Sequence, residues 1–422
     1  MPAAPTSRLI TAEIAGLRVA DLVASFGTPA YVYDSAKIVE RIEELSAFDV
    51  VRFAQKACSN LAIVDLCRRH GTLVDAVSAW EILRALAAGY QPQGQPPPIV
   101  YTADIFDHEA LQLVLDYELH VNCGSPDMID QLGQRVTGRE ISLRINPGFG
   151  HGHSQKTNTG GEQSKHGIWH DQLEMSLARA TSHGLKVSGL HMHIGSGTDL
   201  EHLAQVCDAM EKCAVEVGES LTSISAGGGL PVPYKEDESF VDLGAYFQLW
   251  DATRKRLQDR LGHPLSLEIE PGRFLTAESG YLLTEIRAIK TMGSKTFYLV
   301  DAGFNDLARP ILYGAYHPMS IAPADGSIER PLRDVVVGGP LCESGDIFTQ
   351  EEGGFVQTRS LPEARIGDFL VIGGAGAYGA VMASNYNSKP FAPEVLITDG
   401  KPRIIRRRQV FDDVAGLESI PE

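Results

Sequence analysis

The chain has 422 residues, of which 43% are hydrophobic, and a formal net charge of −17. This length is sufficient for two domains with sizeable cores. The negative charge, without any basic stripe, argues against nucleic acid or anionic membranes as partners. No run of about 18 apolar residues occurs, and residues 1–10 lack a long apolar core. We therefore expect a protein that is neither exported nor membrane-spanning.

The cysteines are widely spaced and form no CxxC pair, so neither a disulfide framework nor a zinc site is indicated. A reducing, cytoplasmic location fits this pattern. The six residues are Cys58, Cys67, Cys123, Cys207, Cys213 and Cys342.

Strand-like and helical runs alternate along the first part of the chain. Residues 1–30 are expected to be a ragged start, followed by a strand at 30–33 and a helix at 35–46. Eight apolar runs then end in polar or glycine residues, with helical stretches such as 61–70, 79–88 and 200–219 between them. Their order predicts a (β/α)8 barrel over residues 31–275, with reactive groups at the C-terminal ends of the strands. The eight runs are 50–55, 73–77, 98–102, 119–123, 140–146, 187–194, 222–226 and 265–270.

The pattern changes after about residue 275. Helical periodicity is expected only near 376–385, and the other regular runs alternate as strands do. The sequence predicts a second, mostly β, barrel-like domain built from residues 276–422 together with 1–30. Its expected strands are 281–290, 296–300, 334–337, 368–372 and 395–397.

Lys56 ends the first predicted barrel strand. The preceding run, 50–54, suits a strand buried on both faces, where an ammonium would be costly. A lysine that loses its proton easily is a candidate for condensing with an aldehyde. A lysine that simply extends from the strand end to water is the simpler alternative.

Two histidines end another predicted strand. Alternation places His191 and His193 on one face, pointing into a barrel. They could bind a metal, but no third ligand is evident nearby, and an imidazole stacked on a planar cofactor fits better.

Small residues follow two strand ends. Ser196 with its flanking glycines, and the run Gly227, Gly228 and Gly229, would let N–H and hydroxyl donors approach a phosphate. A flexible turn is the alternative for the glycines.

The last barrel strand carries two carboxylates. Alternation points Glu268 and Glu270 the same way, near the barrel mouth. A carboxylate beside a pyridine nitrogen would keep that ring protonated, and Arg273 could hold a substrate carboxylate. A structural Glu–Arg pair is the alternative.

In the second domain, the stretches 301–317, 339–346 and 376–379 are unusually polar for strands. Cys342 lies beside acidic residues, which is a poor setting for a thiolate nucleophile. A neutral thiol acting as a proton donor remains plausible.

In this order, these motifs closely resemble the diaminopimelate decarboxylases, which are enzymes of the alanine-racemase-like fold that use pyridoxal 5'-phosphate. The resemblance covers nearly the whole chain. It rests on the Lys56 strand, the turn 193–196, the three glycines, the segment 270–273, Asn305 and Asp306 with Arg309 and Tyr313, the segment 342–346, and the segment 377–379.

The resemblance implies how the cofactor is bound. Lys56 would hold it covalently, His193 would stack on its ring, and Glu270 would pair with the ring nitrogen. Asp75 would support the region of Lys56 and His193. Further contacts to the cofactor, chiefly its phosphate, are expected from Ser196, Gly227, Gly228, Gly229, Gly272, Arg273 and Tyr378.

The resemblance also implies the reaction, which is decarboxylation of meso-2,6-diaminopimelate to L-lysine and CO2, the last step of lysine biosynthesis. Cys342 would donate a proton from the neighbouring subunit of a homodimer with shared active sites. The remote ammonium and carboxylate of this amino-acid substrate require opposite charges in the pocket. The expected substrate-binding residues are Arg273, Arg309, Tyr313, Glu343 and Tyr378.

Three positions depart from the usual family pattern. Trp80 replaces a small residue and is expected to pack outward, Cys58 replaces asparagine, and His166 replaces an aromatic residue. None of them removes a catalytic group. The polar segment 148–167 is the expected lid.

Other functions remain open from the sequence. One is a decarboxylase of the same fold that acts on D-lysine, D-ornithine or arginine, although Arg309, Tyr313 and Glu343 argue against it. Another is an amino-acid racemase, in which Cys342 would be the second base. The third is an inactive paralogue or cofactor carrier, which the intact Lys56, Glu270 and Cys342 disfavour.

Overall fold

The computed structural model describes residues 9–150, 159–193, 195 and 200–421. Its contacts divide the chain into two compact units. We call Val39–Val232 with Ser239–Leu275 the barrel unit, and we call Met1–Ile38, Pro233–Glu238 and Thr276–Glu422 the β unit. The domain bounds expected from the sequence remain a prediction about which parts fold independently.

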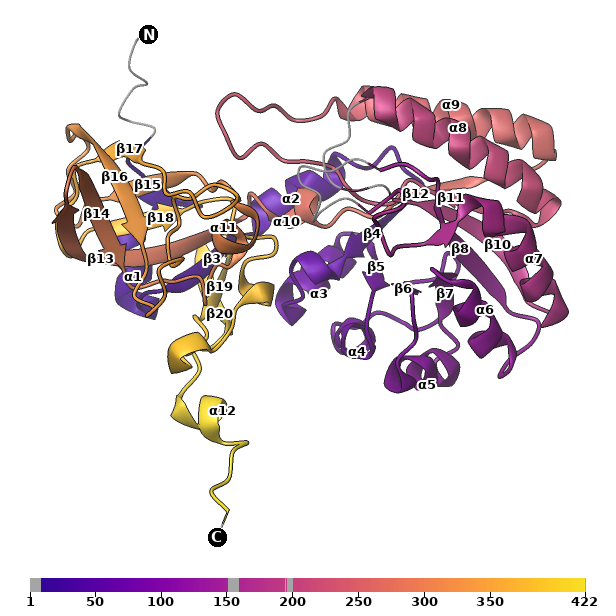
Figure 1. Cartoon of the computed structure of the whole chain (residues 1–422), viewed down its shortest axis with the longest axis horizontal. Coiled ribbons are helices and arrows are strands. Elements are labelled where there is room, and N and C mark those ends of the chain that lie inside the picture. The colour runs from indigo at the N-terminus through magenta and orange to yellow at the C-terminus, as the bar shows by residue number, and fades with distance from the viewer. Residues whose placement is uncertain (1–8, 151–158, 194, 196–199, 422) are drawn as a thin grey trace. The chain divides into compact units, whose positions relative to one another are not determined.

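The barrel unit is a closed ring of eight parallel strands, as the sequence predicted (Figure 1). The strands pair in chain order, and the ring closes where the last strand pairs with the first. A two-residue strand, β9 (Ile168–Trp169), adds to the end of β8. The ring consists of β4 (Val50–Ala54), β5 (Leu73–Ala76), β6 (Ile99–Ala103), β7 (His120–Cys123), β8 (Glu140–Asn146), β10 (Lys186–Met192), β11 (Ser223–Ser225) and β12 (Ser266–Ile269).

Helices follow the strands, and several begin at a polar side chain that accepts a hydrogen bond from the first turn. Asn60, Ser78, Asp107, Ser125 and Asp242 act in this way. Figure 1 shows α8 and α9 side by side on the outside of the ring. The helices are α3 (Leu61–Arg69), α4 (Ala79–Ala87), α5 (His108–Asp116), α6 (Pro126–Gly133), α7 (Leu173–Ser182), α8 (Leu200–Val217), α9 (Leu243–Leu261) and the short α10 (Arg273–Thr276).

The β unit is built on a mainly antiparallel sheet that confirms the predicted second, mostly β part. Its long strand β13 pairs with β3, β14 and β18, and β3 also pairs with β19. The five expected strands are present, and β15, β17 and β20 are additional. The strands are β3 (Ala30–Asp34), β13 (Gly280–Met292), β14 (Lys295–Val300), β15 (Met319–Ala322), β16 (Leu332–Gly338), β17 (Arg359–Pro362), β18 (Phe369–Ile372), β19 (Glu394–Thr398) and β20 (Lys401–Arg406).

Two expectations for this unit were wrong. Residues 1–30 are not merely a ragged start, because the described part contains β1 (Glu13–Ile14), β2 (Leu17–Arg18) and α1 (Val19–Phe26). Apolar side chains of these elements join the core of the β unit, and this burial stabilises a helix that is too short to persist alone. The helical run expected near 376–385 is only one 3₁₀ turn, Ala380–Met382.

The remaining helices are α2 (Ser35–Glu43), α11 (Arg309–Tyr313) and α12 (Phe411–Ala415). Among the described residues, no helix combines the length and the apolar composition needed to cross a bilayer.

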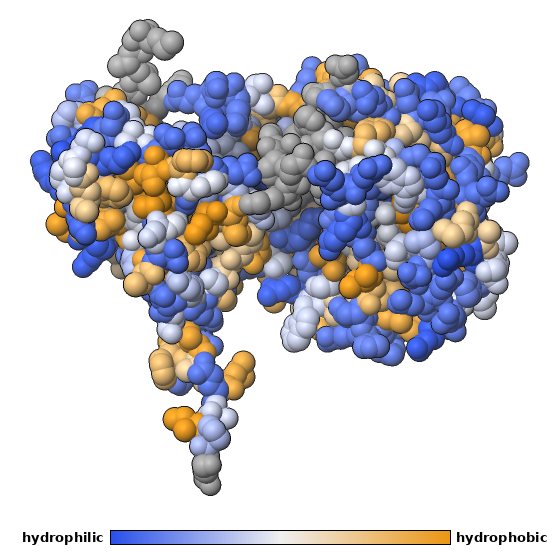
Figure 2. Space-filling model, viewed as in Figure 1, coloured by the Kyte–Doolittle hydropathy of each residue, from blue (hydrophilic) through white to orange (hydrophobic). Residues whose placement is uncertain are grey.

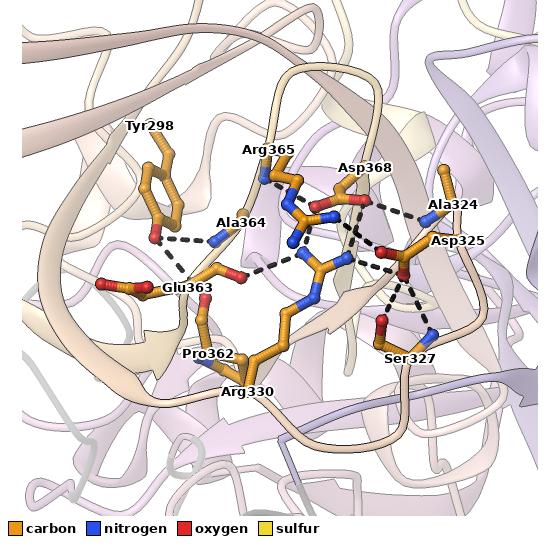
Figure 3. Close-up of polar contacts among 10 residues, drawn as sticks. All are labelled: Tyr298, Ala324, Asp325, Ser327, Arg330, Pro362, Glu363, Ala364, Arg365 and Asp368. Carbon is orange, nitrogen blue, oxygen red and sulfur yellow. Dashed lines mark hydrogen bonds and ion pairs between the residues drawn. The ribbon is translucent and has the colours of Figure 1, made fainter.

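A buried ion pair joins loops of the β unit (Figure 3). Arg330 bonds to Asp368, and both side chains are largely excluded from solvent. Asp368 also accepts from the backbone N–H groups of Ala324 and Arg365. Asp325, which is more exposed, binds the other side of the Arg330 guanidinium.

Replacing Asp368 with alanine should strongly destabilise the β unit. The change leaves a buried guanidinium without its main partner, which typically costs about 3–5 kcal/mol. Calorimetry, together with faster amide hydrogen exchange in β15 and β18, would measure the loss. The exposed Asp325→Ala is the matched control and should shift unfolding much less. Equal effects of the two changes would contradict this account.

Candidate active site

Glu270 lies just beyond the end of β12, inside the ring of strands, and it is buried. Its Oε2 is 2.8 Å from Nε2 of His191 on β10, and Ser225 Oγ on β11 donates to Oε1 over 3.0 Å. Burial alone would raise the pKa of Glu270, but His191, the bond from Ser225 and the charge of Arg52 lower it to about 2. The carboxylate is therefore ionised and held in a fixed orientation.

Two further carboxyl groups lie in the same region but titrate differently. Burial and the charge of Glu270 raise the pKa of Asp75 to about 6. Burial raises the pKa of Glu81 to about 7, against the bond that it accepts from Val77 N–H over 2.9 Å. Environments that separate the pKa values of neighbouring acids are typical of active sites.

Lys56 lies in a 3₁₀ turn, Gln55–Ala57, directly after β4, and its side chain is exposed. The sequence predicted a buried lysine, and this prediction was wrong because the strand ends at Ala54, two residues earlier. Its charge nevertheless lowers the pKa values of Asp75, Glu81 and His193, so the amine is near all three.

His193 follows β10 with a partly buried ring. Burial, followed by the charges of Arg144 and Lys56, lowers its pKa well below the usual range. The imidazole is therefore neutral, as suits a ring that stacks on another flat ring. Its Nδ1 has no hydrogen-bond partner among the described residues.

The three glycines bring the ends of neighbouring strands into backbone contact. A Cβ atom on Gly227, Gly228 or Gly229 would lie within 2.5 Å of the carbonyl oxygens of Met192, Glu270 or Gly195, respectively. Only glycine fits such an approach. Among the described residues, the N–H groups of Gly228 and Gly229 have no acceptor, which leaves two donors for an anion.

Gly272 is also closely packed, since a Cβ there would lie 3.1 Å from the Ala54 carbonyl oxygen. Arg273 begins α10 and is partly exposed. Ser196, the predicted phosphate ligand, lies outside the described residues, as do residues 151–158 of the expected lid.

A polar cavity of about 660 Å³ lies at the opposite end of the barrel from Lys56. Its lining comes from the first residues of the strands and from the loop before β6, and it reaches inward to His191 and Glu270. Arg52 and Glu268 form a buried pair at its side, with Nε and Oε2 2.7 Å apart. Barrel interiors are usually filled by branched apolar side chains. This barrel therefore has a polar interior that can hold water.

Arg309 and Tyr313 lie on α11 of the β unit, and the Arg309 side chain is buried. Arg309 Nη1 donates to Tyr234 Oη over 3.1 Å and lies 3.0 Å from Nε2 of His317. Its guanidinium carbon is 4.9 Å from the centre of the Tyr234 ring. Two loop residues of the β unit, Tyr234 and His317, thus hold this arginine in place.

Cys342 and Glu343 are exposed on a tight loop of the β unit. Asp346 closes the loop by accepting from Leu341 N–H over 2.8 Å, and Cys342 N–H donates to Asn387 Oδ1 over 2.8 Å. The loop therefore presents a thiol and a carboxylate to the surroundings on a fixed backbone.

Tyr378 has a φ of 56°, a left-handed conformation that is uncommon for a tyrosine. Strained backbone of this kind is concentrated at ligand-binding positions.

The barrel unit thus brings together Lys56, Asp75, His193 and Glu270, and it also carries the three glycines, Gly272 and Arg273. The predicted residues that belong to the β unit are Arg309, Tyr313, Cys342, Glu343 and Tyr378. Sequence patterns did not predict Ser225, Glu81 or the role of His191 as partner of Glu270. The available signal was strand alternation, which places His191 and Glu270 on inward faces.

The three departures from the family pattern leave this region intact. Trp80 is 69% exposed and Cys58 is buried. His166 Nδ1 lies 2.6 Å from Asp104 Oδ2.

The residues present fit pyridoxal phosphate. A fixed, ionised carboxylate suits a protonated ring nitrogen, and unpaired glycine N–H groups suit a phosphate. Lys56 supplies an exposed primary amine, and a buried oxygen of Asp75 has no hydrogen-bond partner among the described residues.

The raised pKa of Glu81 predicts a pH effect on stability. The folded cofactor-free protein holds this proton until about pH 7, whereas the unfolded chain releases it near the ordinary pKa of 4.5. Stability should therefore fall between these values as the pH rises, by roughly 3 kcal/mol. Glu81→Gln should remove this part of the fall between pH 5 and pH 8 in urea unfolding. Exposed Glu109→Gln is the control, and an unchanged pH dependence in Glu81→Gln would refute the prediction.

Comparisons with known proteins agree with this geometry. Residues 35–277 match the family model described as pyridoxal-dependent decarboxylase, pyridoxal binding domain. The chain is 57% identical over 399 residues to the diaminopimelate decarboxylase of Escherichia coli (strain K12), covering 94% of this chain and 95% of that protein. It is 52% identical to the diaminopimelate decarboxylase of Streptomyces coelicolor, covering 100% and 96%.

Solved structures give the same result. A crystal structure of diaminopimelate decarboxylase matches with a TM-score of 0.92 and 56% identity, over 94% of this chain and 95% of that one. The diaminopimelate decarboxylase from Helicobacter pylori complexed with L-lysine matches with a TM-score of 0.84 and 32% identity, over 94% and 98%. The chain belongs to the pyridoxal-dependent decarboxylase family and, within it, to the diaminopimelate decarboxylases.

Proposed function

We propose that this protein decarboxylates meso-2,6-diaminopimelate to L-lysine and CO2, using pyridoxal phosphate held in the barrel unit. The main observation behind the proposal is the ionised Glu270, whose carboxylate is fixed by His191 and Ser225. Lys56 lies close enough for its charge to lower the pKa of Asp75 in the same barrel. The high identity to full-length diaminopimelate decarboxylases supports this substrate over D-lysine, D-ornithine or arginine.

When bound, pyridoxal phosphate supplies a ring that takes up the electron pair left on carbon as CO2 departs. Lys56 Nζ would hold the group covalently, and Glu270 would hold a proton at the ring nitrogen. Neutral His193 would lie against the ring. The N–H groups of Gly228 and Gly229 would bind the phosphate.

The remaining groups act on the substrate. The C–C bond to the departing carboxylate breaks, and one proton must return to that carbon. We assign this proton to the Cys342 thiol, which is exposed and therefore accessible to a substrate. Arg309, with Arg273 and Tyr313, would bind the carboxylate remote from the chemistry, Glu343 would accept from the remote ammonium, and Tyr378 would complete the pocket.

We further propose that the working unit is a cytoplasmic homodimer in which Cys342 serves the partner's site. Two features support a partner surface. The loop that carries Cys342 and Glu343 is exposed yet fixed by Asp346. Apolar side chains near the C-terminus are also uncovered, as Figure 2 shows for this segment, and uncovered apolar groups commonly mark contacts. They are Val410, Phe411, Leu417 and Ile420.

Release of CO2 by the cofactor-loaded protein tests the proposed reaction. We expect release from meso-diaminopimelate and little from D-lysine, D-ornithine or L-arginine, because those substrates lack the remote amino-acid group. Lys56→Ala should abolish both the release and the visible absorbance of the bound cofactor. Preferred release from a monocarboxylate would overturn the substrate, and full activity of Lys56→Ala would overturn the site.

Mixing two inactive variants tests the shared site. Cys342→Ala should slow turnover severely while the cofactor absorbance remains, and Lys56→Ala should lack both. If each site combines residues of two subunits, random mixed dimers should regain about a quarter of the wild-type activity. No recovery after verified subunit exchange would exclude the shared arrangement.

A further inference from the structure

His317 occupies a position set by backbone pairing in the β unit. It lies two residues before β15, which pairs with β18 so that Met319 faces Ile372. The ladder continues by one further bond, from Gly373 N–H to the Pro318 carbonyl over 2.8 Å. The carbonyl of Gly373 is thereby fixed beside the imidazole of His317.

The neighbours of His317 admit only one protonation form. The ring is fully buried, and Nδ1 lies 3.0 Å from the Gly373 carbonyl oxygen, which can only accept a hydrogen bond. Nε2 lies 3.0 Å from Nη1 of Arg309, which can only donate. The proton is therefore on Nδ1, and Nε2 is the acceptor. An imidazolium would place an N–H group against the N–H of a guanidinium.

The chain between Arg309 and His317 turns back on itself, which brings the two side chains into contact. Gly314 ends α11 with a φ of 60°, and a Cβ there would lie 2.0 Å from the backbone nitrogen of Glu352. Tyr234 is the second acceptor on Arg309 Nη1, and its ring lies 5.5 Å from that of His317. The two hydrogens of Nη1 thus have two fixed acceptors, which set the plane of the guanidinium.

We propose that His317, as the neutral Nδ1–H form, positions Arg309 for the remote carboxylate of the substrate and so determines substrate specificity. This inference rests on the proposed function, in which Arg309 binds that carboxylate. His317 is a positioning residue, because it acts through Arg309 and not on the reacting atoms. Loss of this acceptor removes one of the two bonds that orient Nη1 and so weakens the fixed orientation of the guanidinium.

Two substitutions distinguish the roles of the two ring nitrogens of His317. His317→Asn places an amide near Nδ1, so it can still donate to Gly373 but offers no acceptor to Arg309. His317→Gln extends to the place of Nε2, so it keeps that acceptor. We expect His317→Asn to raise the KM for meso-diaminopimelate and the Kd for L-lysine roughly 10- to 100-fold, with a much smaller change in kcat. His317→Gln should recover most of this loss.

Cadaverine and Tyr298→Phe are the matched controls. Cadaverine is lysine without the carboxylate, so its affinity should be similar in the wild type and in both variants. Tyr298→Phe removes a different buried hydrogen-bond acceptor of the β unit, the hydroxyl that accepts from Ala364 N–H over 3.1 Å (Figure 3), and should leave the affinity for lysine unchanged.

Three results would overturn the inference while leaving the reaction intact: equal lysine affinity in the Asn and Gln variants, equal losses for lysine and cadaverine, or a Tyr298→Phe effect as large as that of His317→Asn. Failure of the wild type to release CO2 from meso-diaminopimelate would instead overturn the proposed function. Nitrogen-15 NMR of histidine-labelled wild type provides a test without substitution. A His317 signal with the proton on Nδ1 is expected, and an Nε2–H form or an imidazolium would contradict the inference.

Discussion

Burial of the Glu270 charge is the constraint on which the arrangement of the barrel unit depends. An unpaired carboxylate in a protein interior costs several kcal/mol, so the neighbouring strands must supply donors. β10 supplies His191 and β11 supplies Ser225, and each bonds to a different carboxylate oxygen. The pairing of β10, β11 and β12 in one register is what allows three strands to provide one site. The glycines after β11 let the ends of these strands approach closely enough.

In the β unit, an imidazole orients a buried group of the opposite charge. There a buried guanidinium, not a carboxylate, requires partners, and an imidazole again fixes its orientation. His191 places Nε2 against an acceptor, whereas His317 places Nε2 against a donor. The difference lies in what the other ring nitrogen faces, because Nδ1–H of His317 donates to the Gly373 carbonyl and leaves Nε2 as the acceptor. The pairing of β15 with β18 thus places the Gly373 carbonyl so that His317 carries its proton on Nδ1 and accepts from Arg309 at Nε2.

Much of the fold follows from local patterns in the sequence. The eight barrel strands were predicted because each is a short apolar run followed by a helical run. Once the strands are known, their order in the sheet follows, because each pairs with its neighbour along the chain. Residues 1–30 were missed because α1 is stabilised by burial against distant strands and not by its own propensity.

The site was only partly predictable. Glu270 and its direction followed from strand alternation, but its partners did not, because pairing across three strands sets the distances. The exposure of Lys56 depended on where β4 ends, and strand ends are difficult to predict. The role of His317 required the pairing of β15 with β18, which no pattern near residue 317 indicates.

The polar barrel interior has a consequence for the response of the protein to hydrostatic pressure. Pressure unfolds proteins mainly by eliminating empty internal volume, to which dry apolar cavities contribute most. The cavity of about 660 Å³ beneath Glu270 is polar and can hold water, so unfolding eliminates little void there. The volume change on unfolding the barrel unit is therefore expected to be small for its size.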